Sequence, residues 1–164
     1  MTRDDRWLDT LFPKDTERTA PWPPVGETVT LYRPVGEQEL TLIADTDFRA
    51  FPPRLPDQPI FYPVLNFPYA EEIARDWNAR HNTPPVGYVT AFEVDARVAT
   101  GYAIQIVGRE DRHQELWVPA EELGAFNAAI RGPIRVLAHH VGEQYEGHID
   151  PDTHLPEPLR RTPQ

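Results

Sequence analysis

The 164-residue chain contains no cysteine and no serine, and its single lysine is Lys14. These absences exclude a Ser or Cys nucleophile, a disulfide, a thiolate metal site and the lysine of a phosphate-binding P-loop. A Schiff base would have to form on Lys14, which lies in a proline-rich segment. Any catalysis is therefore left to carboxylates, histidines, tyrosines and arginines.

The sequence also lacks a long apolar run, a recognisable signal peptide and an excess of positive charge. No apolar run approaches the roughly 18 residues of a membrane helix, and the start, Met-Thr-Arg-Asp-Asp-Arg-Trp, does not resemble a signal peptide. The formal net charge of −10 argues against nonspecific binding to DNA, RNA or anionic membranes, because such binding depends on cationic side chains. We expect a cytoplasmic protein without a membrane partner.

The composition predicts a single globular domain with less regular ends. Hydrophobic residues make up 40% of the chain and aromatic residues 10%, which is enough for a sizeable core at this length. Residues 1–26 are charged and rich in proline, which predicts an extended arm. Residues 27–142 then form the predicted domain, and the polar, proline-bearing residues 143–164 are predicted to be a flexible tail.

The middle of the chain carries its clearest pattern. Residues 60–65 are apolar and aromatic, which is typical of a buried strand. Pro63 has no N–H for a ladder, so this strand should lie at a sheet edge, at a bulge or beside a cleft. After Asn66, a possible helix cap, apolar residues at helical spacing predict a helix near 68–79. These are Ala70, Ile73, Ala74 and Trp77.

The remaining elements predict an α+β fold with a mostly antiparallel sheet. Further helices are predicted near 37–45 and 119–130, and strands near 27–33, 87–94, 102–107, 113–118 and 134–138. Alternation places Arg33 on the apolar face of its strand. It also places Glu115 on the face of His113 and Trp117. No Gly-x-Gly-x-x-Gly sequence is present, so a dinucleotide would not be held by a Rossmann loop.

Three separated stretches together resemble the ADP-ribosyltransferase superfamily. They are Leu31-Tyr32-Arg33-Pro34, the strand and helix from Pro59 to Trp77, and His113-Gln114-Glu115-Leu116-Trp117-Val118-Pro119. The chain also resembles small bacterial proteins often labelled "ADP-ribosylation/crystallin J". The resemblance covers roughly residues 29–138 by layout. It implies a split, mostly antiparallel sheet with about three helices around a cleft, and NAD as the substrate.

The resemblance implies a catalytic role for Glu115. Cleavage of the nicotinamide glycosidic bond develops an oxocarbenium ion, which a carboxylate at the ribose stabilises. His113 would orient Glu115 or the substrate. Tyr32 and Arg33, at the end of the first strand, would contact NAD, since a guanidinium offers a fork of donors to phosphate or ribose.

The resemblance also implies two further contacts with NAD. Arg54, in a proline-dense loop, would grip a phosphate. Either Phe61 or Tyr62 would lie against the nicotinamide, and the sequence leaves this open because neighbouring strand residues face opposite ways. The chain has no Ser-Thr-Ser motif, so the match is to the branch with an aromatic residue at that position.

A metal site is not predicted, although four histidines lie near the end of the chain. His139 and His140 are neighbours in a predicted strand and point to opposite faces. His148 and His154 lie in the predicted tail. We therefore assign the chain no metal cofactor.

The alternative function is a non-catalytic module that binds a protein partner through its acidic surface. The net charge of −10 and the charged ends of the chain support it. The two hypotheses differ in what they require of Arg33, Tyr62 and Glu115. An enzyme should bring them into one pocket, whereas a module should satisfy Arg33 and Glu115 with structural partners.

Overall fold

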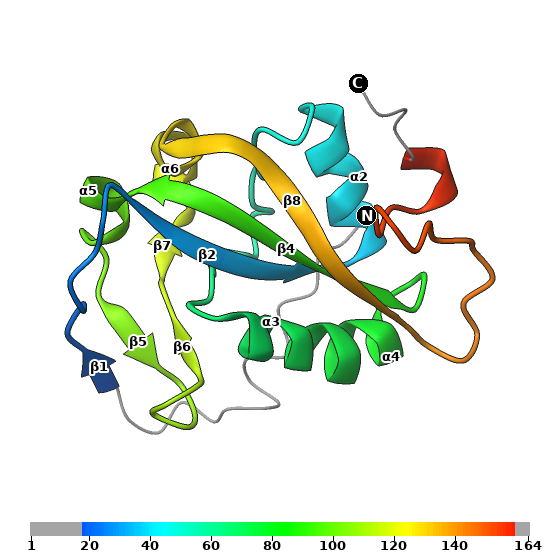
Figure 1. Ribbon diagram of the computed structural model, residues 1–164, viewed down its shortest axis with the longest axis horizontal. Helices are drawn as coiled ribbons and strands as arrows, with labels where there is room; N and C mark the ends of the chain where they lie inside the picture. The colour runs from blue at the N-terminus through cyan, green and yellow to red at the C-terminus, as the bar shows by residue number, and fades with distance from the viewer. Residues whose placement is uncertain (1–17, 160–164) are drawn as a thin grey trace.

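The computed structural model describes residues 18–159 and has a mixed α+β fold with antiparallel sheets (Figure 1). The strands are β1 (Arg18–Ala20), β2 (Thr28–Val35), β3 (Ile60–Phe61), β4 (Val86–Asp95), β5 (Ile104–Ile106), β6 (Gln114–Glu115), β7 (Val118–Pro119) and β8 (Ile130–Val141). The helices are α2 (Glu37–Asp45), α3 (Phe67–Ile73), η1 (Ala74–Asn78), α4 (Ala79–His81), α5 (Ala96–Ala99), η2 (Ala120–Glu122), α6 (Leu123–Ala128) and η3 (Glu157–Leu159). The first 17 residues of the predicted arm, including Lys14, lie outside the described residues, as do residues 160–164.

In the part of the chain that the structure describes, the strands form two three-stranded sheets and the β3–β7 pair, and a single residue links them. β4 lies between β2 and β8, and β5 lies between β1 and β6, with antiparallel pairing throughout. Val64, just after β3, bridges Tyr32 of β2 on one side and Glu115 of β6 on the other. The pairings of Ile60 with Pro119 and of Val64 with Glu115 share one register, so residues 60–64 and 115–119 belong to one ladder.

The sheet opens immediately after the Tyr32–Val64 pair. Tyr32 and Val64 exchange both backbone hydrogen bonds, of 2.9 and 2.7 Å. Such pairs recur at every second residue of an antiparallel ladder, so the next would join Pro34 to Tyr62. Pro34 has no N–H to donate. The Tyr62 carbonyl instead accepts a hydrogen bond from Nη1 of Arg33, at 3.2 Å.

Pro63 interrupts the ladder on the other side of the same segment. The N–H of Leu116 donates to the carbonyl of Pro63 at 2.9 Å, and Pro63 cannot donate in return. The segment that the sequence predicted as one strand over 60–65 is therefore paired on both sides but only in part. Its regular ladder covers Ile60–Phe61, and Val64 adds a single bridge.

Helices cover both faces of the sheet. Figure 1 shows α2 on one side of the long strands and α3 with α4 on the other. The core on the α2 side includes Leu31, Val35, Leu40, Ile43, Phe61, Leu116 and Val118. The core on the α3 side includes Tyr62, Val64, Tyr69, Ile73 and Trp77. Adjacent residues of β2 and of the segment after β3 therefore point into different cores, as strand alternation requires.

Two helices form where the sequence predicted them. The helix predicted at 37–45 is confirmed by α2, which buries Leu40 and Ile43. The helix predicted near 68–79 is confirmed as the continuous run of α3, η1 and α4, from residue 67 to residue 81. Asn66 caps it, because its side-chain oxygen accepts a hydrogen bond from the N–H of Tyr69 at 2.8 Å.

The third helix and the last strand differ from the prediction. The helix predicted near 119–130 ends at Ala128, and Ile130, which the predicted range includes, begins β8 opposite Val94. β8 is longer than the predicted 134–138 because it continues through Gly132 and Pro133. Gly132 has a φ of +76°, and the register with β4 shifts here, which marks a bulge. Proline is tolerated because β8 lies at the edge of its sheet.

The segment from residue 143 to residue 159, which the sequence predicted as part of a tail, makes specific contacts with the domain. The Tyr145 hydroxyl donates a hydrogen bond to Glu37 of α2 at 2.9 Å. Ile149 pairs with Pro156, and Leu155 is buried in the core on the α2 side. Among residues 18–159, no helix is both long and apolar enough to span a membrane.

Candidate functional site

Glu115 is a fully buried carboxylate with an aromatic donor at each oxygen. The Tyr69 hydroxyl donates to Oε1 at 2.9 Å, and the indole N–H of Trp117 donates to Oε2 at 3.0 Å. Tyr69 comes from α3 and Trp117 from the residues between β6 and β7. With one donor at each oxygen, the orientation of the Glu115 side chain is fixed.

Tyr69 is suited to act as a permanent donor. Its side chain is fully buried between α3 and the sheet. Burial, followed by the charge of Glu115, raises the pKa of the Tyr69 phenol well above its ordinary value. Both effects disfavour the phenolate. The hydroxyl therefore keeps its proton throughout the neutral range and continues to hold Oε1 of Glu115.

His113 packs against Tyr69, the tyrosine that donates to Glu115. Its Nδ1 accepts a hydrogen bond from the N–H of Arg109 at 2.7 Å, which places the ring proton on Nε2 when the imidazole is neutral. Nε2 lies 3.3 Å from a carboxylate oxygen of Glu72 on α3. The ring packs edge-on against Tyr69, with the ring centres 5.0 Å apart. The residue predicted to orient Glu115 thus contacts the tyrosine that holds it.

Arg33 forms a buried ion pair on the α2 side of the sheet. Its Nε and Nη2 donate to the two carboxylate oxygens of Glu39, at 2.7 and 3.0 Å. The side chains of Arg33 and Glu39 are 3% and 5% exposed. The guanidinium carbon also lies 4.7 Å from the centre of the Phe61 ring. The fork of donors that the sequence assigned to NAD is directed at Glu39 and Tyr62.

The structure answers which of the two neighbouring aromatic residues shares a face with Glu115. The Phe61 ring packs against Phe51 and Phe126, at centre distances of 5.0 and 5.7 Å, in the core on the α2 side. Tyr62 belongs to the core on the α3 side. Tyr62 and Glu115 therefore lie on the same face of the sheet, and Phe61 lies on the other.

Tyr32 and Arg54, the other two residues predicted to contact NAD, lie near the residues described above. Tyr32 stands opposite Val64 on the Glu115 face and meets Phe67 edge-on, with ring centres 6.3 Å apart. Arg54 donates from Nε to the carbonyl of Ile60 at 3.1 Å, which ties the proline-dense loop to β3. The structure thus groups Tyr32, Tyr62 and Glu115 on one face.

Sequence reasoning missed three partners of this site. Tyr69 and Glu72 lie on the predicted second helix, and Glu39 lies on the predicted first helix. A carboxylate or a tyrosine in the first turns of a helix carries no signal that it faces a strand distant in sequence. Trp117 was placed on the face of Glu115 by alternation, but its bond to the carboxylate was not predicted.

The histidines near the end of the chain form pairs. Nδ1 of His139 lies 2.8 Å from Nδ1 of His154, and Nε2 of His140 lies 3.2 Å from a carboxylate oxygen of Glu71. Within residues 18–159, no group of three or more His, Cys, Asp or Glu side chains is placed to hold a metal ion.

Comparisons of the chain with protein-family models, with curated proteins and with solved structures find no match in any of the three. What points to a function is therefore the geometry of the chain itself. Its strongest feature is a buried carboxylate on a face that also carries Tyr32, Tyr62, Tyr69 and Trp117.

Proposed function

We propose that the protein is an ADP-ribosyltransferase-like protein that binds NAD, with Glu115 at the ribose. The supporting observation is the pair of bridges through Val64, which join Tyr32 of β2 to Glu115 of β6 by way of the segment after β3. These residues belong to the three stretches on which the resemblance depends. The order of these three stretches in the sequence did not require them to be neighbours in the fold. A site built from all three requires that they are.

The chemistry of NAD cleavage fits the surroundings of Glu115. When the glycosidic C–N bond breaks, its electron pair leaves with nicotinamide and the ribose carbon becomes cationic. A carboxylate that is already fixed by Tyr69 and Trp117 can stabilise this charge without reorganising. Water or an acceptor nucleophile then forms the new bond to the ribose carbon. Tyr62, on the same face, is the candidate to lie against nicotinamide.

The proposal gives Arg33 a supporting role. Glu39 occupies the two donors that would hold a phosphate, and a third donor holds Tyr62 in place at the opening of the sheet. His113 would act as a positioning residue, through its contact with Tyr69. Arg54 would support β3, through its bond to Ile60.

Thermal unfolding with and without NAD tests binding, because a ligand that binds only the folded state stabilises it. We expect a rise in Tm at millimolar NAD. Glu115→Gln should retain this rise and lose NAD hydrolysis, because it removes a charge needed mainly in the transition state. The exposed Glu121→Gln is the matched control and should retain both. The absence of a shift in the unmodified protein would contradict the proposal.

A second candidate is a non-catalytic module that binds a protein partner. It is supported by the structural partners of the two residues, because Arg33 pairs with Glu39 and Glu115 accepts from Tyr69 and Trp117. Arg33 and Glu115 also lie on opposite faces of the sheet. Under this candidate Arg33→Ala and Glu115→Gln should each lower Tm, while NAD leaves the Tm of all variants unchanged. NAD hydrolysis that Glu115→Gln abolishes would rule it out.

A further inference from the structure

The segment after β8 returns to that strand and is fastened there by two histidines. His139 lies on β8, and His154 lies in the returning segment, with the two Nδ1 atoms 2.8 Å apart and the ring centres 5.0 Å apart. His154 adopts a left-handed backbone conformation with a φ of +59°. Such a conformation is uncommon outside glycine and requires support from the surrounding contacts.

The distance between the two nitrogens identifies the contact as a hydrogen bond. Two neutral imidazoles can share one proton between facing nitrogens, with one ring donating and the other accepting. A separation of 2.8 Å is normal for such a bond. Two histidine nitrogens bound to one tetrahedral zinc ion would lie roughly 3.3 Å apart, given zinc–nitrogen bonds of about 2.0–2.1 Å. The geometry therefore favours a shared proton over a metal ion.

Among the described residues, the charged groups around the pair do not offer His139 a compensating carboxylate. Burial, then His154 and His140, lower the pKa of His139. His140 is itself directed at Glu71 of α3.

On the other neighbouring elements, the nearby carboxylates are engaged by hydrogen-bond donors. Glu37 of α2 accepts hydrogen bonds from Tyr88, the β4 partner of His139, and from Tyr145. In the returning segment, Asp150 accepts from the backbone N–H groups of Asp152 and Thr153.

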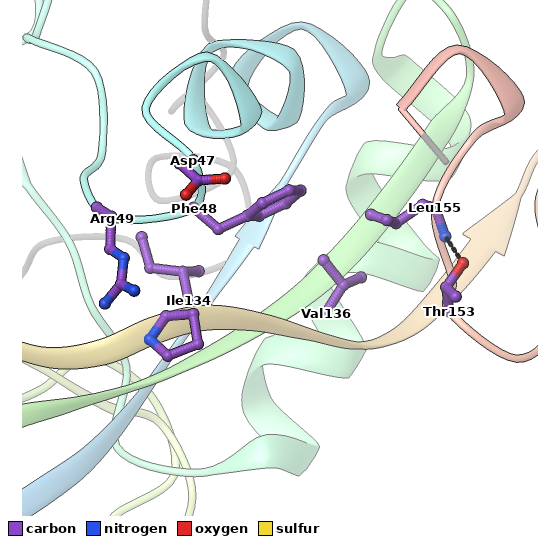
Figure 2. A pocket seen from close by; sticks show the side chains of 8 residues that line it. Asp47, Phe48, Arg49, Ile134, Val136, Thr153 and Leu155 are labelled. Atoms are coloured by element: carbon purple, nitrogen blue, oxygen red, sulfur yellow. Dashed lines mark hydrogen bonds between the residues drawn. The ribbon is translucent and has the colours of Figure 1, made fainter. Parts of the chain in front are cut away.

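The fastened segment forms one wall of a surface cavity. The cavity has a volume of about 330 Å³ and is lined by Asp47, Phe48, Arg49, Pro133, Ile134, Val136, Thr153 and Leu155. Figure 2 shows Thr153 and Leu155, the two neighbours of His154, on one side and Phe48 and Ile134 toward the other. Leu155 is 7% exposed and Ile134 is 3% exposed. Release of the segment would uncover these apolar side chains.

We propose that the His139–His154 pair is an acid-sensitive clasp, which holds residues 143–159 on β8 at neutral pH and releases them when both imidazoles are protonated. Two imidazolium groups cannot share a proton, and two positive charges at this separation repel each other. Release opens the cavity along β8 and exposes its apolar lining. This inference is independent of the proposed NAD site, because neither histidine of the clasp belongs to that site.

The direction of the pH effect follows from the lowered pKa of His139. The released state takes up its proton at a higher pH than the fastened state. Attachment is therefore complete above the ordinary histidine value of about 6.5 and weakens as the pH falls below it. Each unit by which the clasp lowers the pKa corresponds to an about tenfold change in the ratio of fastened to released protein.

Hydrogen exchange tests the clasp in the whole protein. The amides of Asp150 and Glu157 bond within the segment to Leu155 and His148. Release of the segment removes Leu155 from the core and leaves these bonds open to water, so their protection reports the attachment. After scaling for intrinsic exchange rates, we expect their protection to be lower at roughly pH 5.5 than at roughly pH 7.5, by a factor set by the lowering of the His139 pKa. Amides of the central strand β4 should keep their protection. Equal protection of Asp150 and Glu157 at both pH values would overturn the proposal.

His154→Asn is the matched variant. Asparagine tolerates a positive φ and can donate a hydrogen bond to His139, but it cannot take up a proton. We expect the variant to keep its protection at neutral pH and to show a smaller pH dependence, because the repulsion from His154 is gone while the burial of His139 remains. An unchanged pH dependence would contradict the clasp. A second measurement, imidazole titration by NMR in the unmodified protein, is independent of the variant, and two uncoupled titrations near 6.5 would also overturn the proposal.

Discussion

The side chain of Arg33 donates a hydrogen bond to the backbone carbonyl of Tyr62, at the position where a neighbouring strand would otherwise donate. Pro34 cannot supply that donor, so a side chain supplies it. The same guanidinium binds both oxygens of Glu39. One arginine thus links α2, β2 and β3 at the place where the sheet opens.

Loss of this arginine should destabilise the fold severely. Arg33→Met leaves the carboxylate of Glu39 buried without its partner, and breaking a buried pair in this way costs about 3–5 kcal/mol. The double variant Arg33→Met with Glu39→Leu removes both charges, and it should recover most of that loss. Urea denaturation of the two variants measures the difference. Equal stability of the single and double variants would contradict the buried pair.

Asp95 should contribute to resistance against acid. Arg97 first, and then Arg131, hold the pKa of the Asp95 carboxyl well below its usual value. The pKa is lower in the folded state, so the stabilisation is present above the ordinary value of about 3.9 and is lost as the pH falls below it. Asp95→Asn keeps a side-chain oxygen for the N–H of Arg97 but removes the charge. Its destabilisation in urea should shrink as the pH falls from about 5 to about 2, and a constant difference would contradict the ion pairs.

Tyr102 should titrate late in alkaline solution. Burial and the hydrogen bond from its hydroxyl to Glu122, of 2.8 Å, raise the pKa of the phenol to about 12. This contribution to stability is present below about pH 10 and is lost as the pH rises from there toward 12. Ultraviolet difference titration of the protein against Tyr102→Phe isolates the residue. Glu122→Gln should lower its pKa, and a normal value near 10 in the unmodified protein would show that the bond does not form.

Gly87 and Gly124 should respond in opposite ways to alanine. A Cβ at Gly87 would lie 2.5 Å from the carbonyl oxygen of Ala74 and 2.7 Å from Cβ of Asn78. Gly87→Ala should therefore lower the free energy of unfolding by about 1–3 kcal/mol. At Gly124, on α6, a Cβ would meet none of the described residues within 4 Å, so alanine there should stabilise the protein by about 0.5–1 kcal/mol. Melting curves decide both, and a tolerated alanine at Gly87 would mean that η1 can move away from β4.

The sequence predicted most of the local structure because local patterns determine it. The helix predicted near 37–45 is α2, and the alternation of β2 correctly placed Arg33 on a buried face. The bulge at Gly132 was not predicted, since a glycine followed by proline resembles the end of a helix as much as a kink within an edge strand.

The candidate site could be predicted only in part, because it depends on pairing between distant segments. Alternation gave the face of Glu115 relative to Trp117, and it gave the face of Arg33 relative to Leu31. Whether Arg33 and Glu115 share a face of the sheet depends on how their strands are joined through Val64. No local pattern in the sequence specifies that register. For the same reason the sequence did not show that Arg33 and Glu115 point to opposite sides of one sheet.

The opening after Tyr32 also has a mechanical consequence. Among the described residues, two backbone hydrogen bonds, both between Tyr32 and Val64, connect β2 to the segment that follows β3. The two halves of the sheet are otherwise joined by side chains, because the core on the α2 side contains residues of β2 together with Phe61, Leu116 and Val118. Separation of the halves would expose this apolar core to water, so the cohesion of the sheet at this place depends on packing more than on backbone hydrogen bonds.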